Sequence, residues 1–151
     1  MNTSAESSHA LVQQCPVCDA PLRVESFRSG ETVCSKCGHV IWYQKRMVDG
    51  AAIMDAISGI VAINTDIERV SKSLVAGPDK ARVILNLSQL KFISSAFVAG
   101  MIALQKRIRA ADGRLVLCEM HPIVRETLHG ARLDTYFEIC DTEKEALDSL
   151  S

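Results

Sequence analysis

The chain of 151 residues is long enough for one average domain, or for one small domain joined to a metal-stabilised module. Hydrophobic residues make up 48% and charged residues 23%, the usual mixture of a globular protein. The formal net charge is −1, and basic and acidic residues are balanced in the first part of the chain, which argues against a nucleic-acid-binding protein of the general, basic kind.

The first residues, MNTSAESSHA, are small and polar, and residues 1–12 are predicted to form a disordered tail. They contain no cationic segment followed by an apolar one, so no secretory signal is predicted. No apolar run approaches the ~20 residues that cross a bilayer as a helix. We therefore expect a soluble, cytoplasmic protein that does not act at a membrane. In that reducing compartment, its six cysteines are expected to be metal ligands or buried thiols.

Four of the cysteines form two C-x-x-C pairs, CPVC and CSKC, with fifteen residues between them. This spacing is typical of a zinc site in which each pair contributes two thiolates to one tetrahedral ion. The predicted ligands are Cys15, Cys18, Cys34 and Cys37. Four cysteines leave no open coordination position, so we predict one structural Zn²⁺ per chain, which folds a module too small to fold alone. Two disulfides or four free thiols are the alternatives.

The segment around these pairs, residues 13–45, resembles the zinc ribbon family. PLRVESFRSGETV is predicted to form a β-hairpin that turns at Ser29-Gly30, and HVIWY is predicted to supply a third strand. His39 follows the second pair, but four cysteines already satisfy the ion, so His39 is expected to be a bystander. Zinc ribbons often bind nucleic acid, and the alternative is that the aromatic residues pack the ribbon's own core or its junction with the next domain. The candidate stacking residues are Phe27, Trp42 and Tyr43.

Residues 46–151 alternate between strand-like and helix-like segments, as expected for one α/β domain. AAIMDAIS and GIVAIN are predicted to be two short strands around a turn at Ser58-Gly59. TDIERVSKSLVAGP is predicted to be a helix that begins with a capping box made by Thr65 and Glu68.

Further strands and helices are predicted in alternation after this helix. RVILNL, RLVLCEM and YFEIC have the apolar character of buried strands, in which Cys118 and Cys140 are expected to be packing residues. SAFVAGMIALQKRIRAADG, HPIVRETLHG and DTEKEALDSL are predicted to be helices, and Thr142 and Glu145 form a second capping box in the last one. This order implies right-handed crossovers and a mixed, mostly parallel sheet covered by helices.

The stretch VILNLSQLKFISSAFVAGMIAL resembles the STAS domain of anti-sigma factor antagonists. Asn86-Leu87-Ser88 takes the place of the family's Asp-Leu-Ser, and FISSA matches a frequent variant of its next motif. The ending VRETLHGARLDTYFEICDTEKEAL also resembles the family's last helix, strand and helix. The likeness spans about residues 46–150, and it implies an α/β fold with a STAS-like mixed sheet.

The resemblance also implies a function for the two serines of this motif. It places the family's phosphoacceptor at Ser95, with Ser94 as the alternative. In the family, an anti-sigma serine kinase binds the unmodified form and phosphorylates it, and a serine phosphatase restores it. The partner is then expected to contact Ser94, Ser95, Phe97 and Val98. The sequence departs from the common pattern in three ways, since Ser94 replaces Asp, Asn86 replaces Asp, and Phe97-Val98 replaces Gly-Leu.

The serines also have a simpler interpretation. A serine at a helix N-terminus caps free backbone N–H groups, and capping alone explains a serine at this place. The same position accepts a phosphate well, because the helix dipole and the free N–H groups favour an anion. A protein that binds its partner without phosphorylation, as a scaffold, or a ribbon protein associated with nucleic acid, therefore remains the alternative to a phosphorylation switch.

We expect no enzymatic activity. Ser95 does not lie in a G-x-S-x-G motif, and nothing in the sequence pairs it with a base. His121 and His129 are assigned to the start and the last turn of a short helix. No glycine-rich phosphate-binding loop is present. The sequence makes no prediction of the oligomeric state.

Overall fold

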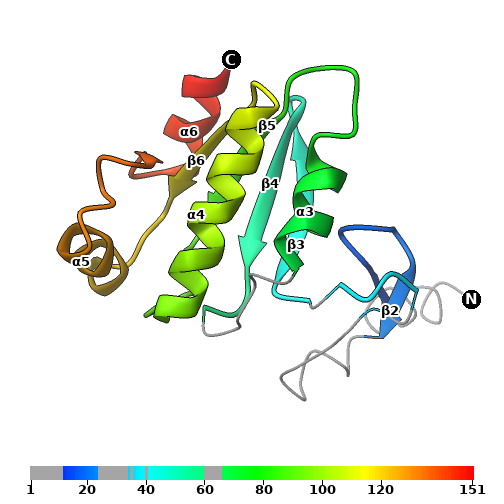
Figure 1. Ribbon diagram of the computed structural model, residues 1–151, viewed down its shortest axis with the longest axis horizontal. Coiled ribbons are helices and arrows are strands. Elements are labelled where there is room, and N and C mark those ends of the chain that lie inside the picture. Colours follow the sequence, from blue (N-terminus) through cyan, green and yellow to red (C-terminus); the bar gives the residue numbers. More distant parts are fainter. Residues whose placement is uncertain (1–11, 24–33, 35, 40, 60–65) are drawn as a thin grey trace, which may run out of the picture. The chain divides into compact units, whose positions relative to one another are not determined.

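The structure is a computed structural model of the chain that describes residues 12–23, 34, 36–39, 41–59 and 66–151. The chain divides into two compact units, Met1–Ile41 and Trp42–Ser151. The sheet of the second unit begins with strand β3 (Tyr43–Val48), inside the segment predicted to belong to the ribbon (Figure 1). The predicted ribbon strand HVIWY is therefore wrong over its described residues, because Trp42 lies outside any strand and Tyr43 belongs to β3.

The first unit contains a small antiparallel sheet of β1 (Val12–Gln14) and β2 (Pro21–Arg23), in which Gln14 is opposite Pro21. The first C-x-x-C pair lies in the connection between these strands. The hairpin predicted to turn at Ser29-Gly30 falls mostly outside the described residues. Its first strand is described, and this strand pairs with β1, which precedes it in the chain.

The second unit is built on a five-stranded sheet with the order β3-β4-β5-β6-β7. β3 and β4 are antiparallel, and the other three pairs are parallel, which confirms the predicted mixed, mostly parallel sheet. After β3, the strands are β4 (Ala51–Ala56), β5 (Arg82–Asn86), β6 (Arg114–Cys118) and β7 (Glu138–Ile139).

The antiparallel pair turns at Asp49-Gly50. The hairpin predicted around Ser58-Gly59 is not formed by β4, because β3 and β5 occupy both sides of this strand. Val48 is opposite Ala51, so two residues connect the strands. Asp49 and Gly50 have φ of 51° and 81°, as a type I′ hairpin turn requires. A Cβ at Gly50 would also overlap the guanidinium of Arg82. GIVAIN, apart from its first residue, lies outside the described residues.

Four helices accompany this sheet in the part of the chain that the structure describes. They are α3 (Ile67–Leu74), α4 (Ser95–Ala110), α5 (Pro122–Gly130) and α6 (Glu143–Leu150). The capping box of α6 is confirmed, because Thr142 accepts a hydrogen bond from the Glu145 N–H and the Glu145 side chain accepts one from the Thr142 N–H. The N-cap of α3 is Asp66, without a side-chain cap bond, and Thr65 lies outside the described residues. None of these helices is both long and apolar enough to span a membrane.

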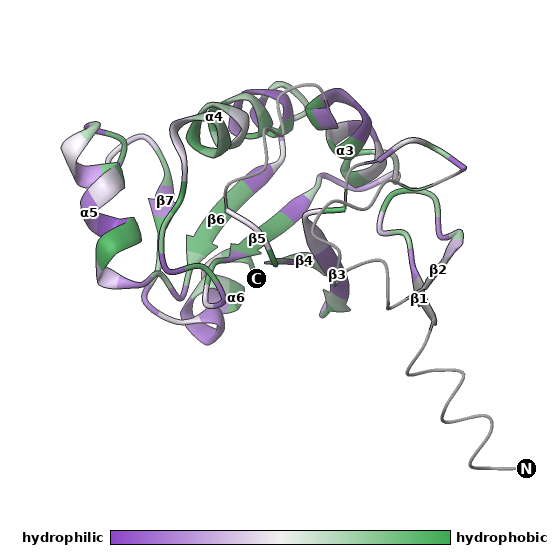
Figure 2. Ribbon diagram, turned by 90° about the horizontal axis from the view of Figure 1, so that it is seen from below, coloured by the Kyte–Doolittle hydropathy of each residue, from purple (hydrophilic) through white to green (hydrophobic). Residues whose placement is uncertain are grey.

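The helices cover both faces of the sheet. Figure 2 shows α3 and α4 on one side of the apolar strands β5 and β6, and α6 on the other. Side chains alternate between the two faces along each strand, so Leu115 and Leu117 face α4 while Val116 and Cys118 join the cluster against α6. Cys118 is fully buried and Cys140 packs against the same cluster, which confirms that both are packing residues.

A polar network joins α6 to the end of the sheet where β5 ends. Arg46 donates hydrogen bonds of 2.6 and 2.8 Å to Asp55 and one of 2.7 Å to Oε1 of Glu143. The Asn86 amide donates to the same Glu143 oxygen at 2.8 Å, and its Oδ1 accepts the N–H of Ser88 at 2.9 Å. A carboxylate at position 86 would face Glu143 with like charge, which explains the presence of an amide here.

Glu143 makes this network dependent on pH. The hydrogen bond from Arg46 lowers the pKa of Glu143, burial offsets part of this effect, and the hydrogen bond from Asn86 lowers the pKa further. Because the folded state favours the ionised form, the stabilisation is present above the ordinary pKa of 4.5 and is lost as the pH falls through the lowered value.

We expect Glu143→Gln to lower the free energy of unfolding by about 1 kcal/mol at pH 7 and by progressively less as the pH falls below 4.5. Urea unfolding at several pH values measures both differences. Glu126→Gln, on the exposed surface of α5, is the matched control and should have no effect at either pH. A Glu143→Gln effect that stays constant between pH 7 and pH 3.5 would contradict the assignment.

Candidate functional site

The connection from β5 to α4 places the two serines beside the carboxyl ends of the parallel strands β4, β5 and β6. Ligands of open α/β sheets commonly bind at these strand ends. The N–H of Ser94 donates to the carbonyl oxygen of Gly59 at 2.9 Å, which fastens the connection to the chain that follows β4. Only glycine fits at position 59, since a Cβ there would stand 2.7 Å from the carbonyl oxygen of Phe92.

Ser94 is the N-cap of α4. It has extended φ and ψ of −83° and 162°, and its Oγ accepts the N–H of Phe97 at 3.1 Å. Its carbonyl oxygen accepts the N–H of Val98 at 3.0 Å and so begins the helical hydrogen-bond pattern. The capping interpretation that the sequence offers for the two serines is therefore confirmed for Ser94, whose side chain is half-buried.

Ser95 is the first residue of α4 and is exposed. Within the described residues, its hydroxyl has no hydrogen-bond partner, in contrast to that of Ser94. The free N–H groups of the first turn and the dipole of the 16-residue helix α4 favour an anion at this position. Chemically, the Ser95 hydroxyl is available for modification without loss of a bond that holds the fold.

Phe97 does not lie on the surface that a partner would meet, in contrast to its predicted role as a contact residue. Its side chain is 0% exposed, and its ring packs edge-on against that of Trp42 with 5.5 Å between centroids. Trp42 in turn packs against Tyr43 at 4.7 Å, and both rings are also fully buried. Trp42 and Tyr43 are therefore core residues of the second unit and are not available to stack on nucleic acid.

Phe92 is an exposed aromatic residue that the sequence analysis missed as a contact. Its side chain is 59% exposed, whereas the neighbouring Ile93 is only 7% exposed. The available signal was the position of Ile93 directly before the N-cap, where an apolar residue turns inward against the first turn. If Ile93 points inward, its neighbour points outward. Phe92 precedes Ser95 by three residues and the half-buried Val98 follows it by three, so both are candidates for an apolar contact near Ser95.

The four predicted metal ligands converge in the first unit. The Sγ atoms of Cys15 and Cys37 are 3.8 Å apart, and those of Cys18 and Cys34 are 3.6 Å apart. All four Sγ atoms lie within 4.8 Å of one another. A tetrahedral Zn²⁺ with bonds of ~2.3 Å holds its sulfur ligands ~3.8 Å apart, so this arrangement fits the ion. Among the residues that the structure describes, His39 is buried nearby but is not a member of the cluster.

The two C-x-x-C pairs adopt the same backbone turn. In the first, the N–H of Asp19 donates to the carbonyl oxygen of Cys15 at 2.9 Å, and in the second Gly38 donates to Cys34 at the same distance. Asp19 and Gly38 both have positive φ, 66° and 82°, a conformation that Asp and Gly tolerate well. Each turn therefore presents its two thiols on one side.

These thiols are suited to a cation. Burial is the main reason that the pKa of Cys15 is raised to about 12, since the thiolate is disfavoured without a compensating charge. A divalent cation would supply that charge, and thiolates are the form that binds it.

Comparison with known proteins assigns the two parts of the chain to two families. The STAS domain model matches residues 46–146, and the TFIIB zinc-binding model matches residues 13–45. BtrV of Bordetella bronchiseptica, assigned as an anti-sigma factor antagonist, is 33% identical over 101 residues, which cover 66% of this chain and 85% of BtrV.

Solved structures show the same fold. An anti-sigma factor antagonist from Thermotoga maritima superposes with a TM-score of 0.63 at 20% identity, over 72% of this chain and 93% of that one. SpoIIAA, an anti-sigma factor antagonist, superposes in its unphosphorylated form with a TM-score of 0.57 at 22% identity, over 71% of this chain and 94% of SpoIIAA. The chain belongs to the STAS domain family, with a TFIIB-type zinc ribbon ahead of the domain and anti-sigma factor antagonists among its relatives.

Proposed function

We propose that this protein is a regulatory binding protein of the anti-sigma factor antagonist type, and that phosphorylation of Ser95 switches its binding. The observation that carries the proposal is the division between the two serines. The Ser94 side chain caps α4, whereas Ser95 is exposed and its hydroxyl has no hydrogen-bond partner within the described residues. The partner surface comprises Phe92, Ser95 and Val98, and the buried Phe97 supports it from below.

A phosphate on Ser95 would act on the partner and leave the fold in place. It adds about −1.5 to −2 charges at neutral pH. The helix N-terminus tolerates this charge, and the cap from Ser94 is not disturbed. A partner that covers Phe92 and Val98 would have to desolvate the phosphate, and an acidic partner surface would also repel it. Binding would therefore be weakened without a conformational change in this protein.

The partners follow from the resemblance. We expect an anti-sigma serine kinase-like protein that binds the unmodified form and phosphorylates it, and a serine phosphatase that removes the phosphate. SpoIIAA has been solved in both a phosphorylated and an unphosphorylated form, the former with a TM-score of 0.53 to this chain at 22% identity. This supports a reversible switch on the same fold. The relatives are regulators, which is consistent with a protein that is not itself an enzyme.

The ribbon is proposed to bind one Zn²⁺ through its four cysteines. The ion would supply the positive charge that the buried thiolates need and would hold the two C-x-x-C turns together. A closed four-sulfur site has no open position for a substrate, so this metal has a structural role.

Alanine substitutions of the two serines should have different effects on phosphorylation and on stability. Ser95→Ala should abolish phosphate incorporation by the cognate kinase and leave the melting temperature unchanged, since its hydroxyl holds nothing in the fold. Ser94→Ala should be destabilised by about 1 kcal/mol through loss of the cap, and Ser95 should still be phosphorylated.

Mass spectrometry of the protein isolated from native cells, together with thermal unfolding of the purified variants, measures these effects. Ser95→Asp should weaken capture of the kinase at least tenfold, with Ser88→Asp, an exposed serine earlier in the same connection, as the control. Phosphate found on Ser94, or unchanged binding by Ser95→Asp, would contradict the proposal.

Metal analysis tests the ribbon separately. The purified chain should contain about one zinc per molecule. Cys34→Ser should lose most of it, whereas Cys140→Ser, in the second unit, should retain it. A metal-free wild-type protein, or full zinc content in Cys34→Ser, would refute the four-cysteine site.

A further inference from the structure

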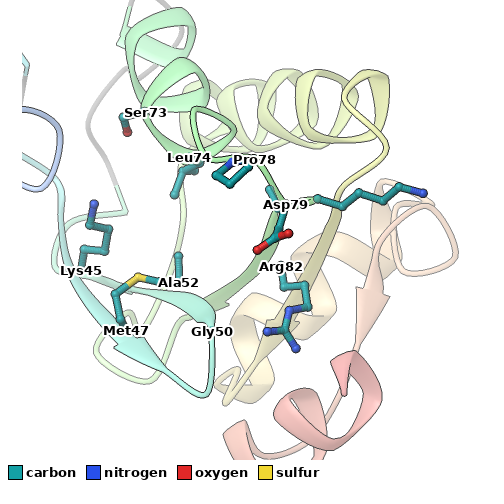
Figure 3. Close-up of a pocket in the computed structure, with 12 residues that line it drawn as sticks. Lys45, Met47, Gly50, Ala52, Ser73, Leu74, Pro78, Asp79 and Arg82 are labelled. Atoms are coloured by element: carbon teal, nitrogen blue, oxygen red, sulfur yellow. The ribbon is translucent and has the colours of Figure 1, made fainter.

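A groove opens in the second unit near the start of β5, whereas Ser95 follows the end of that strand. Its volume is about 270 Å³, and all of its lining belongs to the second unit. Figure 3 shows Lys45 and Met47 of β3 on one side and Leu74 and Pro78, at and beyond the end of α3, across from them. The start of β5 closes one end, because Arg82 also lines the groove. None of these residues belongs to the partner surface around Ser95.

Small residues on the neighbouring strand make the groove hollow. Lys45 and Met47 lie on the same face of β3, and Met47 is paired with Ala52 of β4. Ala52 lines the floor with only a methyl group, so the space beside Met47 is not filled by the sheet itself. Met47 is 63% exposed, which is unusual for a large apolar residue within a strand.

The charged groups around the groove carry an excess of positive charge. The ionisable residues that line it are Lys45, Asp79, Lys80 and Arg82. Within the described part of the chain, none of these three cations pairs with a carboxylate. Arg82 donates to the carbonyl oxygens of Asp49 and Leu150, at 2.9 and 3.3 Å, which holds its guanidinium toward α6, so the cations that face a ligand of the groove are Lys45 and Lys80. In a chain with a net charge of −1, this is a local basic site.

The groove lies beside an edge strand. In the described sheet, β3 is the outermost strand, which pairs with β4 on one side and with no strand on the other. An edge strand offers backbone N–H and C=O groups to an extended segment of another chain. Antiparallel pairing of two β3 strands centred on Lys45 would place this cation opposite Lys45 of the second copy, which is unfavourable. The charge therefore disfavours self-association and favours an acidic strand.

We propose that Lys45–Val48 of β3 and the adjoining groove bind an extended, acidic segment of a partner protein. The segment adds a strand to β3, places carboxylates near Lys45 and Lys80, and lays a small apolar side chain beside Met47. Backbone pairing supplies affinity, and the cations select acidic sequences. This site is independent of the proposed switch at Ser95, because the groove lies at the start of β5, whereas Ser95 follows the end of β5.

The test is a titration of the ¹⁵N-labelled, zinc-loaded full chain with a capped ten-residue peptide of alternating glutamate and valine, followed by NMR. We expect saturable shifts centred on the amides of residues 45–48 and 52, and none from the matched lysine–valine peptide. The double variant Lys45→Glu/Lys80→Glu should bind the acidic peptide at least tenfold more weakly. Lys106→Glu, exposed on α4, should bind it like the wild type.

Four results would overturn the proposal. They are the absence of saturable shifts, equal binding of the basic peptide, shifts confined to residues 92–98, and the same shifts with pyrophosphate alone at similar affinity, which would assign the site to a small anion. Concentration-dependent shifts in β3 without peptide would show that a second copy occupies the edge, and would also refute it. Failure of the Ser95 switch in the kinase experiment would leave these outcomes unchanged.

Discussion

The hydrogen bond from the Phe97 N–H to the Ser94 hydroxyl is the interaction on which the candidate site depends. It fixes where α4 begins, and the burial of Phe97 against Trp42 fixes how the first turn is rotated. With residue 94 capping and residue 97 inward, Ser95 and Phe92 are left facing out. The bulky residue that departs from the common family pattern is thus accommodated in the core.

Local patterns predicted much of this architecture, and the errors arose where distant segments compete. Periodicity and end signals placed α4, β5, β6 and α6, because helix caps and buried strands are encoded within a few residues. The hairpin turn lies at Asp49-Gly50 and not around Ser58-Gly59, because the pairing of β3 with β4 selects it. The orientation of Phe97 also depends on Trp42, which is far away in sequence, and Trp42 had been assigned to the ribbon. The cysteine spacing needed no such information, since a tetrahedral ion constrains it directly.

The two ends of the parallel strands differ in chemistry, and the two proposed binding sites lie at these different ends. Where β5 ends, the Asn86 amide donates to Glu143, and its Oδ1 accepts the N–H of Ser88 in the connection to α4. Near the start of β5, a basic groove lies beside β3, whose outer side pairs with no strand in the described sheet. A phosphate added at the first end changes surface charge locally, and screening over about 8–10 Å limits its effect on the second.

Amide hydrogen exchange at Phe97 tests the central claim most directly. The account predicts slow exchange of this N–H in the wild type and in Ser95→Ala, and at least tenfold faster exchange in Ser94→Ala, with the strands β4 to β6 unchanged in all three. Faster exchange in Ser95→Ala, or no change in Ser94→Ala, would show that the two serines do not divide their roles in this way.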